Sequence, residues 1–194
     1  GDDLISRVVT ADVGGQVLDD DEALAIVTQV LIAGVDTVVN CLGFALLQLA
    51  RNTALAAELS AASSKDVLSA THELFRRFGL VIIARTVKKD MEFHGVSLKA
   101  GELMCIPTQV HGLDARINAC PMQVDLARQR ARHSAFGSGP HMCPGQELAR
   151  AEVAITIEEW LKRIPRFRVA ADADTNCSGG IVGQINKLIL EWDI

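Results

Sequence analysis

A glycine-rich stretch at residues 136–145, Phe-Gly-Ser-Gly-Pro-His-Met-Cys-Pro-Gly, places one cysteine just before a helical pattern. Three glycines and two prolines in ten residues cannot continue a helix or a central strand, so we expect a shaped turn. A cysteine just before a helix N-terminus feels the positive end of the helix dipole, which favours its thiolate form. Cys143 is therefore a candidate nucleophile or metal ligand, although an isolated cysteine is more often an inert, buried thiol.

Two further patterns have ordinary structural explanations when each is taken alone. Ala33-Gly34-Val35-Asp36-Thr37 fits a helix with a small-residue contact and a buried polar pair. Glu73 and Arg76 are three residues apart, so they share a helix face and would normally form a modest surface ion pair.

Taken together and in this order, the three patterns resemble the cytochrome P450 family. The loop is similar to the family's haem-binding loop, the Ala-Gly-x-Asp-Thr stretch to its oxygen-activation motif, and Glu-x-x-Arg to a structural element upstream of the cysteine. The resemblance is closest to the soluble bacterial camphor-hydroxylase type, and it covers the C-terminal half of such a protein. It implies a mainly α fold with small β-sheets, built around a long central helix, the cysteine loop and a proximal helix. Residues 1–194 would then be a single partial domain, the haem-binding half, with the N-terminal half absent.

The resemblance also implies the cofactor, haem b, with the Cys143 thiolate as its proximal iron ligand. Arg85 and His141 would pair with the haem propionates, as a guanidinium fork suits a carboxylate. Ile83 departs from the pattern, because close relatives carry an acid there. The remaining cofactor contacts would be Phe136, Gly137 and Gly145 on the loop and Ala33 and Gly34 on the central helix.

The same resemblance assigns the catalytic and structural roles. Thr37 would hold dioxygen and a water, its hydroxyl loosening the helix locally, and Asp36 would relay protons. Glu73, Arg76 and Arg128 would form a buried cluster that fixes the irregular segment behind the haem. We expect N–H groups of the loop to point at the cysteine sulfur, and Arg150 to be an exposed cation that docks an acidic ferredoxin.

The long helix raises the question of a membrane. Acidic residues at 19–22 supply helix caps, and the apolar pattern then runs without proline to residue 51, predicting roughly 30 residues and about 45 Å. Residues 30–50 have spanning length, but Asp36, Asn40 and Gln48 lie among them, and an acid near the bilayer centre is costly. We therefore predict a buried central helix, with a membrane-anchored binding module as the poorer alternative.

The other elements follow from periodicity and turn residues. We predict helices at residues 52–64 and 66–79, and an irregular segment at 111–132. A helix after the cysteine should bury one face and end at Pro165. Strands are expected at 81–87, 91–98 and 103–107, with a hairpin at the C-terminus and a short helix and small turn or hairpin in residues 4–18.

Composition excludes several classes of protein. Hydrophobic residues make up 49% and charged residues 22%, which is ordinary for a globular chain, and the net charge of −5 gives no support to nucleic-acid binding. The five cysteines include no C-x-x-C pair, which suits a reducing cytoplasm rather than a disulfide framework, and we predict that the other four are buried and inert. No signal peptide is visible, so a cytoplasmic location is expected.

Two functions remain open at this point. In the first, the chain is part of a haem-thiolate monooxygenase that uses dioxygen and electrons from a [2Fe-2S] ferredoxin to hydroxylate a small hydrophobic molecule, such as a terpenoid. In the second, it is a haem-free, catalytically inactive fragment. Because the central helix would expose apolar surface, we expect a homo-oligomer or a domain-swapped dimer.

Overall fold

The computed structural model describes residues 1–193, and the chain divides into two compact units, Gly1–Thr37 and Val38–Ile194. The first unit starts with α1 (Leu4–Val9), capped by Asp3, whose Oδ1 accepts the N–H of Ser6 at 2.8 Å. A small hairpin follows, β1 (Asp12–Val13) and β2 (Gln16–Val17), which supports the predicted turn. Its turn residues Gly14 and Gly15 have φ of 66° and 89°, a region that favours glycine.

Helix α2 (Asp20–Arg51) starts at a reciprocal cap. The N–H of Glu22 donates to Asp19 Oδ1 at 2.8 Å, and the N–H of Asp19 donates to Glu22 Oε2 at 3.1 Å. This capping box satisfies two N–H groups that the helix itself cannot pair, which confirms the predicted start. The helix has 32 residues, close to the expected length.

The prediction that α2 is buried is wrong for its N-terminal part, whereas the expectation that this helix exposes apolar surface is confirmed there. Leu24, Leu31 and Val35 are 64%, 64% and 58% exposed, and Ala23 is the one buried residue among residues 1–37. The most apolar 18-residue window of α2 has a mean hydropathy of 2.0 and is only 11% buried, so α2 passes a length-and-composition test for a membrane span. The physical reason is size: α1 and a six-residue hairpin offer too little surface to cover this helix.

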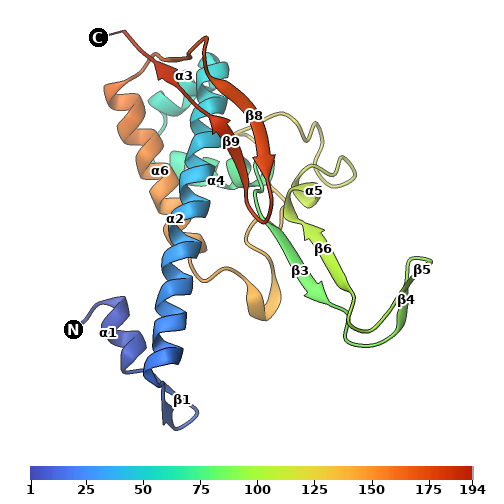
Figure 1. Ribbon diagram of the computed structural model, residues 1–194. Helices are drawn as coiled ribbons and strands as arrows, with labels where there is room; N and C mark the ends of the chain where they lie inside the picture. The colour runs from blue at the N-terminus through green and yellow to red at the C-terminus, as the bar shows by residue number, and fades with distance from the viewer. Residues whose placement is uncertain (194) are drawn as a thin grey trace. The chain divides into compact units, whose positions relative to one another are not determined.

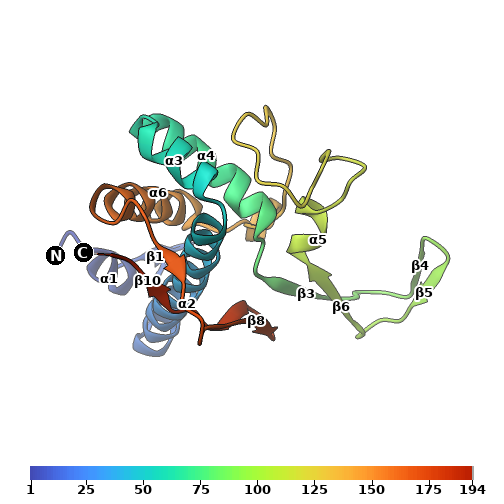
Figure 2. The same cartoon turned by 90° about the horizontal axis from the view of Figure 1, so that it is seen from above.

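The second unit holds the main core. Ala45 and Leu49 at the end of α2 pack with α3 (Thr53–Ala61), α4 (Ser64–Arg77) and α6 (Gln146–Arg163), and α6 lies against both α3 and α4 (Figures 1 and 2). Asn52 and Ser63 cap α3 and α4 through their side-chain oxygens. The other members of this core are Leu55, Ala56, Leu59, Val67, Ala70, Leu74, Phe75, Val153, Ala154, Ile157, Leu161 and Phe167. As expected, α6 ends just before Pro165.

The strands of the described chain form two-stranded antiparallel sheets. β3 (Ile82–Thr86) pairs with β6 (Leu103–Pro107), and β4 (Met91–Phe93) with β5 (Val96–Leu98) extends from the far end of that ribbon (Figure 1). β8 (Asp174–Gly179) and β9 (Gly183–Lys187) form the expected C-terminal hairpin, and β7 (Arg168–Val169) pairs with β10 (Leu190–Glu191).

Two segments position the candidate site. The turn between β8 and β9 bonds to the start of β3, since the N–H of Ile82 donates to Ile181 O and that of Gly183 to Leu80 O, both at 2.9 Å. After the short helix α5 (Thr108–Gly112), the chain runs irregularly to the 3₁₀ turn η1 (Gly139–His141), as expected for this stretch. The helix-rich architecture with small sheets confirms the fold class that the resemblance implied.

Candidate functional site

The cysteine loop closes on itself through backbone hydrogen bonds. The N–H of Cys143 donates to Phe136 O at 2.8 Å, and the N–H of Met142 donates to Gly139 O at 3.0 Å. Gly137 and Gly139 have φ of 72° and 69°, which other residues rarely adopt, so glycine is needed at both positions. The loop therefore holds Cys143 at a defined place, three residues before the start of α6.

Cys143 differs from the other cysteines in its surroundings. It is a free, half-buried thiol, and a Cβ atom at Gly145 would lie 3.9 Å from its Sγ. Burial raises the pKa of Cys41 to about 12, which keeps that thiol protonated and inert. The prediction that all four other cysteines are buried is wrong for three of them, because their strands and turns lie at the surface. These exposed thiols are Cys105, Cys120 and Cys177.

The start of the loop is packed against α4. The ring centroids of Phe136 and Phe75 are 4.7 Å apart. Those of Phe136 and His133 are 6.3 Å apart, in an edge-to-face arrangement. His133 Nδ1 accepts the N–H of Ala135 at 3.2 Å, a bond that fixes the chain just ahead of the loop. Burial, helped by the charge of His72, lowers the pKa of His133 to about 4, so the ring is neutral and can accept this bond.

The expected hydrogen bonds to the cysteine sulfur are not found. Within residues 1–193, no N–H group bonds to Cys143 Sγ, and the side-chain amide of Gln146 lies 4.0 Å from Met142 Sδ instead. Pro144 contributes to this, because it has no N–H to offer directly after the cysteine.

Arg76 is fully buried and all of its donors are used. Its Nε and Nη2 form a bidentate pair with Glu73, at 2.7 and 2.8 Å. Its other three N–H groups donate to carbonyl oxygens of Gly112, Pro121 and Gln123, each at 2.7 Å. A buried guanidinium with five partners avoids the desolvation cost that an unpaired charge would carry.

Glu73 joins Arg76 to a second arginine. Its carboxylate accepts from Arg128 Nε at 3.1 and 3.0 Å and from the N–H of Asp125 at 3.0 Å. Arg128 Nη1 donates to Ala119 O at 2.9 Å. The structure thus brings Glu73, Arg76 and Arg128 together, and the cluster ties α4 to the irregular segment.

Asn118 is a further anchor that the sequence did not reveal. It is 2% exposed, and its amide donates to Gly112 O at 3.2 Å and Arg132 O at 2.9 Å, while its Oδ1 accepts the N–H of Arg132 at 3.2 Å. An asparagine in a polar, non-periodic segment is typical of any turn, so the pattern held no specific signal. A Cβ atom at Gly112 would lie 2.1 Å from Arg76 O, which makes glycine necessary there.

The two side chains expected to bind propionates are both at the surface. Arg85 on β3 is exposed, and its Nη1 donates only locally, to Ala84 O at 2.8 Å. His141 is exposed on η1. Neither side chain is buried in the core, and both are accessible to an anionic group.

The residues expected on the central helix lie in the first unit. Thr37 Oγ1 donates a hydrogen bond to Ala33 O at 2.7 Å. Helix α2 is continuous at this point, so this bond forms without interrupting the helix. A Cβ atom at Gly34 would meet no atom within 4 Å, and Asp36 is exposed.

Arg150 is not the exposed cation that was expected. Its side chain is 15% exposed, pairs with Glu147 at 3.0 Å and donates from Nε to Thr71 Oγ1 at 3.4 Å. Arg150 is held by one partner on its own helix, Glu147, and by one on α4, Thr71.

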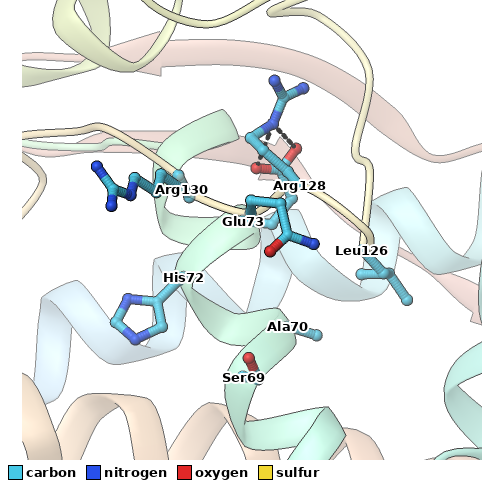
Figure 3. A pocket seen from close by; sticks show the side chains of 9 residues that line it. Ser69, Ala70, His72, Glu73, Leu126, Arg128 and Arg130 are labelled. Atoms are coloured by element: carbon cyan, nitrogen blue, oxygen red, sulfur yellow. Dashed lines mark hydrogen bonds and ion pairs between the residues drawn. The ribbon is translucent and has the colours of Figure 1, made fainter.

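A pocket of about 250 Å³ lies between α4 and the chain at residues 126–131 (Figure 3). Ser69 and His72 line it from α4, and Arg128 and Arg130 line it from the irregular segment. Desolvation and the charge of Arg150 lower the pKa of His72, so this histidine is neutral near pH 7.

Known proteins share sequence and fold with this chain over most of its length. The family model described as Cytochrome P450 matches residues 2–178. The chain is 39% identical over 190 residues to "Probable cytochrome P450 127A1" of Sinorhizobium fredii, covering 98% of this chain and 46% of that protein. It is 34% identical over 172 residues to "Steroid C26-monooxygenase" of Mycobacterium tuberculosis, covering 88% of this chain and 46% of that protein.

The fold is shared with solved structures of the same kind. The crystal structure of CYP101J2 matches with a TM-score of 0.93 and 45% identity, over 100% of this chain and 49% of that one. The chain therefore spans about half the length of the proteins it matches.

Proposed function

The chain belongs to the cytochrome P450 family, and on that premise we propose that it is the haem-thiolate part of a monooxygenase whose iron ligand is Cys143. The observation that carries this proposal is the closed loop, in which two glycines with positive φ hold one free cysteine at the start of α6.

The residues present fit the group that the family implies. Among residues 1–193, no group of three His, Cys, Asp or Glu side chains could hold a metal ion, so the chain offers no ordinary protein-only metal site. A single thiol in a preformed loop would instead hold the iron of a haem, as thiolate-ligated haem proteins do. Arg85 and His141 are exposed and would serve as propionate partners. Phe136, Gly137, Gly145, Ala33 and Gly34 remain proposed cofactor contacts.

Haem bound through a thiolate supplies dioxygen activation for insertion of one oxygen atom into an unreactive C–H bond. The chain's own residues would hold a water molecule in position and supply protons. The Thr37 hydroxyl donates its hydrogen bond to Ala33 O, so the lone pairs of Oγ1 stay free to accept a hydrogen bond from a water or a protonated group. Asp36, an exposed carboxylate on the neighbouring position, would exchange protons with solvent.

Compact hydrophobic molecules such as terpenoids or steroids are the substrate class we propose. Relatives of this chain are named Steroid C26-monooxygenase and Pentalenic acid synthase, and one structural neighbour was solved with testosterone. A [2Fe-2S] ferredoxin in the cytoplasm is the proposed electron donor. Arg150 is not proposed again as its docking residue, because the side chain is already engaged.

Product formation tests the proposal. The chain is combined with a polypeptide corresponding to the half of CYP101J2 that it does not match, then with haem, ferredoxin, reductase and a panel of terpenoids and steroids under labelled dioxygen. We expect a product that carries one labelled oxygen atom, and we expect Thr37→Ala to lower the product formed per electron consumed. A preparation with stoichiometric haem that forms no product from any panel member would contradict the proposal.

The second candidate is a haem-free, inactive oligomer. The exposed apolar side chains on α2 favour it, because burying such a surface against another copy is stabilising. Haem uptake separates the two candidates: the first requires it to depend on Cys143, and the second predicts none.

A further inference from the structure

The pocket beside α4 is separate from the cysteine loop. No residue of the loop lines it, and its walls are α4 and the segment at residues 126–131 (Figure 3). Its volume, about 250 Å³, is enough for a small molecule or ion with its water. Nothing in the proposed oxygenase chemistry uses this space.

Positive charge around the pocket exceeds negative charge. Glu73 is the one carboxylate that lines it, and both of its oxygens are already bonded to Arg76 and Arg128. Arg128 is 11% exposed, and its Nη2 has no hydrogen-bond partner within residues 1–193. Glu73 carries one negative charge and Arg76 and Arg128 carry two positive charges, so the cluster as a whole has a surplus of one positive charge.

A second guanidinium adds to this surplus. Arg130 lines the same pocket, and its side chain forms no ion pair or hydrogen bond with any residue from 1 to 193. The Ser69 hydroxyl and the neutral imidazole of His72 supply further donors from the opposite wall. Donors on two walls suit a tetrahedral oxyanion, whose oxygens point in several directions, better than a planar carboxylate that one guanidinium fork can satisfy.

We propose that this pocket binds a small tetrahedral oxyanion, inorganic phosphate or the phosphate of a phosphomonoester, through Arg130, Ser69 and His72, with the charge of Arg128 adding to the attraction. Binding neutralises the surplus charge of the cluster and links α4 to the irregular segment a second time. The proposal does not depend on haem or on the oxygenase function.

Calorimetric titration of the haem-free chain tests it, with inorganic phosphate, glycerol 2-phosphate and acetate as probes. We expect both phosphates to bind with one-to-one stoichiometry and acetate to bind much more weakly. Arg130→Gln removes an exposed side chain with no structural partner, and it should weaken phosphate binding roughly tenfold or more, since a hydrogen bond to a charged group is lost. Ser69→Ala should weaken it less.

Arg132→Gln is the matched control, because this arginine is exposed nearby but does not line the pocket. Its phosphate affinity should equal that of the wild type. Equal losses in Arg130→Gln and Arg132→Gln would show general charge attraction and overturn the site, as would an absence of phosphate binding by the folded wild type. Acetate binding as tight as phosphate would overturn the assignment of a tetrahedral ligand.

Discussion

One carboxylate, that of Glu73, holds two arginines at the junction of α4 and the irregular segment. Its side chain is 4% exposed, and Arg76 is completely buried. A charge in this position is tolerated only because each donor has an acceptor, so the three residues depend on one another. The sequence placed Glu73 and Arg76 on one helix face, but only the resemblance connected them with Arg128, because no local spacing predicts a contact across 55 residues.

Glu73→Gln is expected to lower the free energy of unfolding by about 3–5 kcal/mol, because it leaves two guanidinium groups buried without a counter-charge. Urea unfolding followed by circular dichroism measures this. Glu159→Gln is the control, since that acid pairs with Lys162 and Arg163 at the surface, where ion pairs contribute little. Similar midpoints for the two variants would show that the cluster is not a stabilising anchor.

His133 predicts a pH dependence of stability. The pKa of its imidazole is about 4 in the folded chain and 6.5 in its ordinary state. As the pH falls, this imidazole is therefore protonated at a higher pH in the unfolded chain than in the folded chain. Stability from this group is therefore present above pH 6.5 and is lost between about pH 6.5 and 4. The groups that act on it are His72, His111, Arg76 and Glu73.

His133→Asn checks this, since an asparagine oxygen can still accept the Ala135 N–H but does not titrate. Unfolding free energies of wild type and variant, measured across pH 4–7, should converge or cross as the pH falls. A constant difference over the whole range would contradict the assignment.

At the scale of elements, local signals predicted α2, α3, α4 and α6 and the C-terminal hairpin to within a few residues. Caps, apolar periodicity and Pro165 are local, so one sequence is enough to read them. Burial of α2 could not be read in the same way, because an apolar helix looks alike whether another element covers it or not. The orientation of Arg150 was missed for a related reason, since its partner Thr71 comes from a different helix.

The exposed face of α2 predicts association. Leu31→Lys and Val35→Lys should reduce both dye binding to apolar surface and the apparent mass in light scattering, because they place charges on the most exposed part of the helix. Leu103→Lys on β6 is the control, as it replaces an apolar side chain that is 70% exposed elsewhere. A wild type that stays monomeric and does not bind the dye would contradict this expectation.

At the scale of the whole molecule, the chain matches about half the length of its relatives and carries the cysteine loop within that half. The family, the helix-rich fold and the loop could be predicted because ten contiguous residues carry most of the signal. Substrate choice could not, since no contiguous motif encodes the shape of a substrate pocket.

The identity of the iron ligand is tested most directly by the absorbance spectrum of the chain after it is mixed with haem, reduced and exposed to carbon monoxide. The proposal predicts a Soret band shifted far to the red in the wild type and in Cys120→Ala, and no such band in Cys143→Ala. Haem uptake with an unshifted band, or a band that survives Cys143→Ala, would contradict thiolate ligation by Cys143.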